Sequence, residues 1–84
     1  MKKIVDFYLV EVKFSGKLSD YSKHDLYDMA LVVQARRQDF TPAFSVNIDV
    51  EKFPEVDGNI DIIDDLQNEH LAIVKYSWIR QEVI

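Results

Sequence analysis

The chain has 84 residues, of which 48% are hydrophobic and none is cysteine. These figures predict a single domain spanning residues 1–84 with one packed core, and they exclude disulfide frameworks and thiolate zinc sites. The net charge of −5 argues against direct binding of nucleic acid, which depends on an excess of positive charge.

The N-terminal lysines are followed by apolar side chains, a pattern that superficially resembles a signal peptide. Asp6, Glu11 and Lys13 interrupt the apolar run, and no small-residue cleavage site follows. No segment reaches the roughly 18 uncharged apolar residues that a membrane-spanning helix requires. We therefore expect a cytoplasmic protein without membrane association, and the absence of cysteine fits a reducing compartment.

The first predicted element is a strand over Ile4–Phe14, which ends before Gly16. Its apolar side chains fall on both faces, with Val5, Phe7 and Leu9 on one face and Tyr8, Val10, Val12 and Phe14 on the other. Two apolar faces are typical of a strand in the middle of a sheet that is covered on each side.

A helix is predicted next, from its cap Ser22 to Arg37. Asp25 stands three residues after Ser22, as in a capping box, and good helix formers follow. One face of this helix carries Leu26, Met29, Ala30, Val33 and Arg37. The rival interpretation makes Met29–Arg36 a strand that pairs with the next strand through a turn at residues 38–42.

The segment Ala43–Glu51 alternates between apolar and polar residues, which predicts a half-buried strand with one face exposed to solvent. Its apolar side consists of Phe44, Val46, Ile48 and Val50. Pro54 and Gly58 then bracket a turn.

Residues 60–70 fit a short helix that Asp57 or Asn59 would cap, with Ile60, Ile63 and Leu66 toward the core. The last segment, Ala72–Val83, is rich in β-branched and aromatic residues and predicts a terminal strand. The elements together predict an α+β domain, with a mainly antiparallel sheet of three strands and one or two helices packed on it. A fourth strand is expected if the segment after Ser22 is a strand.

Acidic residues are concentrated in one part of the chain. Between positions 49 and 69 a single base, Lys52, stands among eight acids: Asp49, Glu51, Glu55, Asp57, Asp61, Asp64, Asp65 and Glu69.

Asp57, Asn59 and Asp61 match the first ligands of a calcium loop. Ile62 replaces the turn glycine of such a loop, and Asn68 replaces its bidentate glutamate, so we expect no metal site.

A well-capped helix explains only part of this charge. Carboxylates in the first turn stabilise a helix by about 0.3–1 kcal/mol each, which accounts for Asp57, Asp61 and Asp64. Asp61, Asp65 and Glu69 are spaced four residues apart, where like charges on a helix repel by about 0.2–0.5 kcal/mol per pair. The excess charge is either a solvated surface or an acidic face that binds a basic protein partner.

The second interpretation assigns partner binding to two groups of residues. They are the acids Asp49, Glu51, Asp57, Asp61, Asp64, Asp65 and Glu69, and the aromatic anchors Tyr76 and Trp78. If the basic partner handles nucleic acid, the chain would be a stoichiometric inhibitor and partial nucleic-acid mimic, of the kind that phages and other mobile elements use.

Two other functions give the last strand a different role. A binder of single-stranded nucleic acid would stack bases on Tyr76 and Trp78 beside Arg80, with Lys75 and the Arg36–Arg37 pair on the phosphates. A structural subunit would form a homodimer through the edge of this strand, because a strand rich in β-branched and aromatic residues without proline is prone to edge pairing.

No motif points to catalysis or to a cofactor. His24 and His70 belong to no metal-ligand pair, and the serines show no nucleophile pattern. Gly16 and Gly58 lie too far apart to form a phosphate-binding loop. We therefore expect a protein that is not an enzyme and uses no cofactor.

Overall fold

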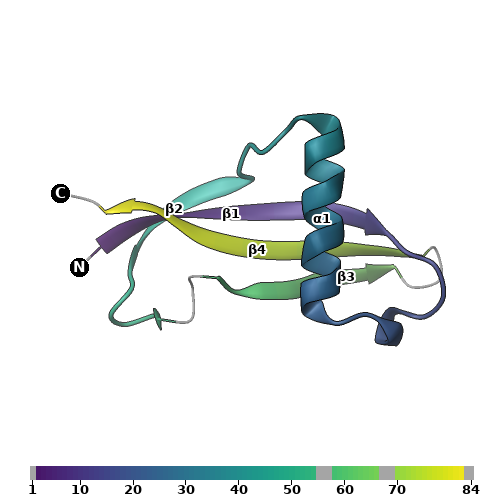
Figure 1. Cartoon of the computed structure of the whole chain (residues 1–84). Coiled ribbons are helices and arrows are strands. Elements are labelled where there is room, and N and C mark those ends of the chain that lie inside the picture. The colour runs from purple at the N-terminus through teal and green to yellow at the C-terminus, as the bar shows by residue number, and fades with distance from the viewer. Residues whose placement is uncertain (1, 55–57, 67–69, 83–84) are drawn as a thin grey trace.

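A computed structural model describes residues 2–54, 58–66 and 70–82, and for residues 63–66 and 81–82 it describes the backbone alone. Four antiparallel strands form an open sheet in the order β2-β1-β4-β3, and a helix runs across one face of this sheet (Figure 1). The predicted α+β class is therefore confirmed.

The strands are β1 (Lys2–Lys13), β2 (Phe44–Asp49), β3 (Ile60–Leu66) and β4 (Leu71–Glu82), and a short 3-10 helix, η1 (Leu18–Asp20), precedes helix α1 (Lys23–Arg37). The pairing of β1 with β4 is the longest in the sheet and runs from Lys3 opposite Glu82 to Lys13 opposite Leu71. Since β2 pairs with the other side of β1, the central position predicted for the first strand is confirmed.

The predicted helix is also confirmed, and its start is set by local chemistry. The Ser22 hydroxyl accepts a hydrogen bond from the Asp25 N–H at 3.1 Å, and the Asp25 carboxylate accepts one from the Ser22 N–H at 2.9 Å. Leu26, Ala30 and Gln34 are buried at intervals of four residues, as one face of a helix requires. The rival strand over Met29–Arg36 is wrong.

The core lies between α1 and the sheet. Val10 and Val12 of β1 and Val74 and Tyr76 of β4 are buried together with Leu26 and other residues of the same cluster. These contacts remove apolar surface from water, which is the main favourable contribution to folding.

Residues 60–66 form strand β3, and the helix predicted for this segment is therefore wrong. β3 pairs with β4 from Ile60 opposite Tyr76 to Leu66 opposite Leu71, with a register shift between Ile62 and Asp64. The side of β4 that faces away from β1 has backbone groups that need partners, and β3 supplies them. A strand also removes the repulsion expected on a helix, because residues four apart along a strand are separated by about 13 Å.

The first half of β4 lies inside the sheet, which corrects the expectation that the last strand as a whole offers an edge for pairing. From Leu71 to Tyr76 it has β1 on one side and β3 on the other. The sheet ends instead at β2 and β3. Being last in the sequence does not place a strand last in the sheet, because two antiparallel partners can flank it.

Helix α1 covers one face of the sheet only (Figure 1). The molecule measures 45 × 27 × 16 Å, and its short dimension fits one sheet with one layer of helix. The helix cover therefore lies on one side of the first strand. On the other side Leu9 is exposed, whereas Val5 and Phe7 are buried although no helix lies over them. In the ranges that the structure describes, no helix is long and apolar enough to cross a membrane.

Candidate protein-interaction surface

We refer to the face of the sheet that lies away from α1 as the open face. Side chains alternate along β1, so Tyr8 and Val10 pack toward the helix whereas Phe7 and Leu9 lie on the open face. Residues directly opposite each other in paired strands share a face. Phe44 of β2 lies opposite Phe7, and Val46 lies opposite Val5, so both belong to the open face.

Large apolar side chains on this face are exposed to solvent. The exposed fractions are 42% for Leu9, 48% for Phe44, 41% for Val46 and 54% for Phe53, which follows β2 in the chain. The rings of Phe7 and Phe44 stack with their centroids 4.8 Å apart and an interplanar angle of 12°. The strand predicted over Ala43–Glu51 was expected to bury its apolar side, and the exposure of Phe44 and Val46 corrects this expectation.

A pocket of about 380 Å³ opens on the same face. Its lining residues come from three strands and the segments next to them: Phe7, Asn47, Ile48, Asp49, Phe53, Asn59 and Lys75. The Lys75 ammonium lies 5.3 Å from the centroid of the Phe7 ring, a distance at which a cation is attracted to an aromatic face. The pocket combines apolar walls with a few polar groups, which suits the insertion of an apolar side chain from a partner.

The acids predicted to form one continuous surface lie on opposite edges of the sheet. Asp49 ends β2 and Glu51 follows it, whereas Asp61 belongs to β3, with β1 and β4 between them. The structure therefore does not bring these acids together. The Asp61 carboxylate lies 3.6 Å from the Lys23 ammonium, and both side chains are largely exposed, so the pair contributes at most about 1 kcal/mol.

The other predicted acids fall in or near β3. Asp64 and Asp65 lie in this strand, where only their backbone is described, and Asp57 and Glu69 lie outside the described residues. The acidic face expected on a helix does not form, because residues 60–66 are a strand. What the structure retains is an edge strand that carries aspartate at positions 61, 64 and 65.

The two predicted aromatic anchors differ in exposure. Tyr76 is only 2% exposed, and its hydroxyl donates a hydrogen bond to the side-chain oxygen of Gln34. Burial raises the pKa of Tyr76 to about 12. Tyr76 is therefore a core residue and is not available to a partner. Trp78 is 38% exposed and meets Tyr27 edge-on at 5.8 Å.

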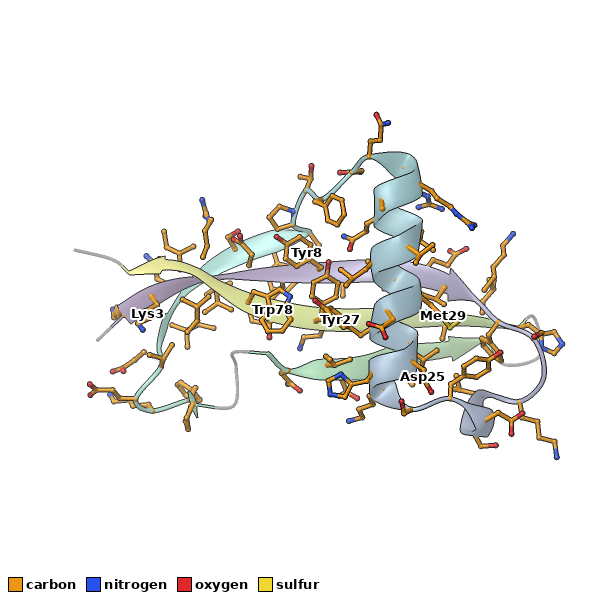
Figure 2. All side chains as sticks on the ribbon, in the orientation of Figure 1. Lys3, Tyr8, Asp25, Tyr27, Met29 and Trp78 are labelled. Carbon is orange, nitrogen blue, oxygen red and sulfur yellow. The ribbon has the colours of Figure 1, made fainter. Side chains whose placement is uncertain are left out.

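The residues expected to bind single-stranded nucleic acid are not assembled on one surface. Figure 2 shows Trp78 with Tyr27 and Tyr8 on the helix side of the sheet, whereas Lys75 lies beside Phe7 on the open face. The Arg80 guanidinium donates a hydrogen bond at 3.1 Å to Asp6, whose carboxylate is buried. Arg36 and Arg37 stand in the last turn of α1.

The two histidines lie in different parts of the structure, His24 in α1 and His70 directly before β4. His24 is exposed in the first turn of α1, and the ring of His70 packs edge-on against Phe14 with centroids 5.7 Å apart. Within the described part of the chain, no three His, Asp or Glu side chains lie close enough to hold a metal ion.

The open face was not predicted as an interaction site. The alternation after Ala43 places Phe44 and Val46 on one apolar side of a strand, which is the signal that the sequence carries for this face. The same pattern predicts burial, because sequence alone does not tell whether a helix lies over that side. No protein-family model, no curated protein and no solved structure matches the chain.

Proposed function

We propose that this protein is a non-enzymatic binding module whose protein partner docks on the open face of the sheet. The supporting observation is that Leu9, Phe44 and Val46 are exposed together on β1 and β2 while α1 covers only the other face. Contiguous apolar patches on a small protein typically mark interaction sites. A partner would form the layer over the apolar face that α1 leaves uncovered.

Burial of this face would provide the main energy of binding. Each large apolar side chain that becomes fully buried contributes about 1.5–3 kcal/mol. Association and the ordering of side chains cost several kcal/mol, so only part of this gain becomes affinity. Phe44 and Phe53 are the candidate anchors, because aromatic side chains bury the most area for few rotatable bonds.

The charge of the protein indicates a basic partner. The net charge is −5, and acids flank the open face at both edges, with Asp49 and Glu51 beside β2 and Asp61 on β3. Such a distribution would attract a positively charged protein and increase its association rate. A cytoplasmic protein that handles nucleic acid is the specific partner we favour, with the chain acting as its inhibitor in the manner of a mobile-element protein.

The test compares baits that differ on one face only. Proteins are captured from a lysate of the source organism with three baits. The baits are wild type, the open-face variant Phe44→Ser/Val46→Thr, and the control variant Phe40→Ser/Val32→Thr. Phe40 and Val32 are a matched control because they are 52% and 49% exposed and do not belong to the sheet: Val32 lies in α1, and Phe40 lies between α1 and β2. We expect one partner on wild type and control that is absent from the open-face variant. Equal capture by all three baits would disprove the proposal.

A second measurement tests the charge of the partner. The association rate of the purified partner is measured at increasing salt concentration for wild type and for an Asp61→Asn variant. Screening shortens the range of attraction to about 8 Å at physiological ionic strength, so a basic partner should associate more slowly as salt rises. A rate that does not depend on salt would retain the open face as the site but reject a basic partner.

A further inference from the structure

The two edges of the sheet differ in how they are protected against pairing with another strand. β3 carries three aspartates in seven residues, and its register with β4 shifts between Ile62 and Asp64. Charge and register irregularities are devices by which sheet edges avoid association. β2 (Phe44–Asp49) has one charged residue, at its last position, no proline and no register shift against β1.

We propose that β2 pairs antiparallel with β2 of a second copy of the chain, about a two-fold axis that passes through Val46. The two four-stranded sheets would then form one continuous sheet of eight strands. Both helices would lie on the same face, because the axis is perpendicular to the sheet. This inference is independent of the proposed function, and it would join two open faces into one larger surface.

The sequence of β2 is self-complementary in this register. Val46 would lie opposite Val46 of the second copy, and Phe44 would lie opposite Ile48, which places apolar pairs on the open face. Ser45 would lie opposite Asn47 on the helix side. The Ser45 hydroxyl already donates to Asp6, and its oxygen can accept a hydrogen bond from the Asn47 amide. Cross-strand pairs of matched character are the unit of sheet stabilisation.

The charge distribution also fits a second copy. In this register Asp49 and Glu51 of one chain approach residues 41–43 of the other. Arg37 and Thr41 line one pocket at the end of α1, so Arg37 lies near that segment, with Arg36 in the same last turn of the helix. The acidic β3 strands would be at the two outer ends of the eight-stranded sheet, where their mutual repulsion is weakest.

The first test uses charge complementation at the axis. Sedimentation equilibrium of wild type from about 1 µM to about 500 µM should show a shift from the 9.9 kDa chain toward twice that mass. Val46→Lys and Val46→Glu should each be monomeric, because each would place like charges directly opposite each other. An equimolar mixture of the two variants should form a heterodimer.

Three outcomes would overturn the proposal. They are a wild type that stays monomeric, a Val46→Lys variant that still dimerises, and a mixture that stays monomeric although circular dichroism shows both variants folded. Val32→Lys is the matched control for the added charge, since Val32 is exposed on α1, and it should dimerise like wild type.

The second test uses cysteine, which the chain lacks. Opposite residues in antiparallel strands have Cβ atoms about 4.5–5.5 Å apart, close to the about 3.5–4.5 Å of a disulfide. Under a glutathione redox buffer, Val46→Cys should form a disulfide-linked dimer and Val32→Cys should remain monomeric. Equal cross-linking of both variants would show random collision and would reject the proposed register.

Salt distinguishes this proposal from the proposed function. Two copies that each carry a net charge of −5 repel, whereas Asp49 and Glu51 of one copy lie toward Arg37 of the other, and salt screens both effects. The dimer should therefore depend less on salt than the binding of a basic partner, which screening should weaken. A dimer that is lost at the same salt concentration as the partner complex would contradict an apolar contact centred on Val46, and it would leave the open-face proposal unaffected.

Discussion

The hydroxyl of Tyr76 donates a hydrogen bond to the side-chain oxygen of Gln34, joining strand β4 to helix α1 inside the core. Both residues are buried, and they are 42 positions apart in the chain. Tyr76 also stacks on Tyr8 with ring centroids 4.7 Å apart and meets Tyr27 edge-on at 5.0 Å. The helix is therefore held on the sheet by a specific polar bond as well as by apolar contacts.

Tyr76→Phe should lower the free energy of unfolding by about 1–3 kcal/mol, because Gln34 would keep a buried oxygen without its donor. Urea denaturation followed by circular dichroism measures this loss. The double variant Tyr76→Phe/Gln34→Met should lose less, since it leaves no buried polar group without a partner. A single variant as stable as wild type would show that this hydrogen bond makes no net contribution.

The stability of the protein should fall in alkaline solution. Burial raises the pKa of Tyr76 from 10.0 to about 12, so the folded state holds this proton more tightly than the unfolded chain. The resulting stabilisation is complete below about pH 10 and is lost as the pH rises through about 12. Denaturation midpoints across this range should fall more steeply for wild type than for Tyr76→Phe.

Tyr8 also contributes to the loss of stability at alkaline pH, so the denaturation midpoint of the Tyr76→Phe variant should still fall in part as the pH rises. Burial raises the pKa of Tyr8, the Asp6 carboxylate adds to this increase, and the Arg80 guanidinium opposes it. Identical pH profiles for wild type and Tyr76→Phe would contradict the assignment to Tyr76.

The Asp6–Arg80 pair should matter more to stability than the Lys23–Asp61 pair. The Asp6 side chain is only 8% exposed and also accepts a hydrogen bond from the Ser45 hydroxyl at 2.6 Å. Arg80→Leu removes the guanidinium from a buried carboxylate and should cost about 1–3 kcal/mol. Lys23→Leu is the control and should cost less than about 1 kcal/mol, because that pair is exposed. Equal losses of stability in Arg80→Leu and Lys23→Leu would show that the burial of Asp6 does not strengthen its ion pair with Arg80.

Gly58→Ala should destabilise the protein and change the environment of Trp78. Gly58 has φ of +70°, and a Cβ atom there would lie 3.1 Å from the indole ring. A side chain in this backbone region costs about 1–2 kcal/mol. Trp78 is the only tryptophan, so its fluorescence maximum reports the contact directly.

Gly16→Ala is the control for backbone strain at Gly58. Gly16 also has positive φ, at +78°, but the nearest atom to an added Cβ belongs to Asp20. This variant should lose stability without a change in tryptophan emission. An emission shift in both variants, or in neither, would refute the contact between Gly58 and Trp78.

The sequence by itself determined the features that depend on near neighbours in the chain. Helix α1 follows from the reciprocal hydrogen bonds of Ser22 and Asp25, which link residues three apart, and from apolar residues at helical spacing. The strands around Val5, Val46 and Val74 follow from alternation and β-branched residues. These local preferences were enough to predict the α+β class.

The tertiary structure decided the conformation of segments whose local sequence favours a helix and a strand about equally. Residues 60–66 have isoleucines that suit either a helix or a strand, and the backbone of β4 selects the strand because its outer side needs hydrogen-bond partners. The same pairing places the first half of β4 inside the sheet and the acids of β3 at an edge. Whether Phe44 and Val46 are covered depends on which side of the sheet α1 packs against, and the alternation of β2 does not encode that choice.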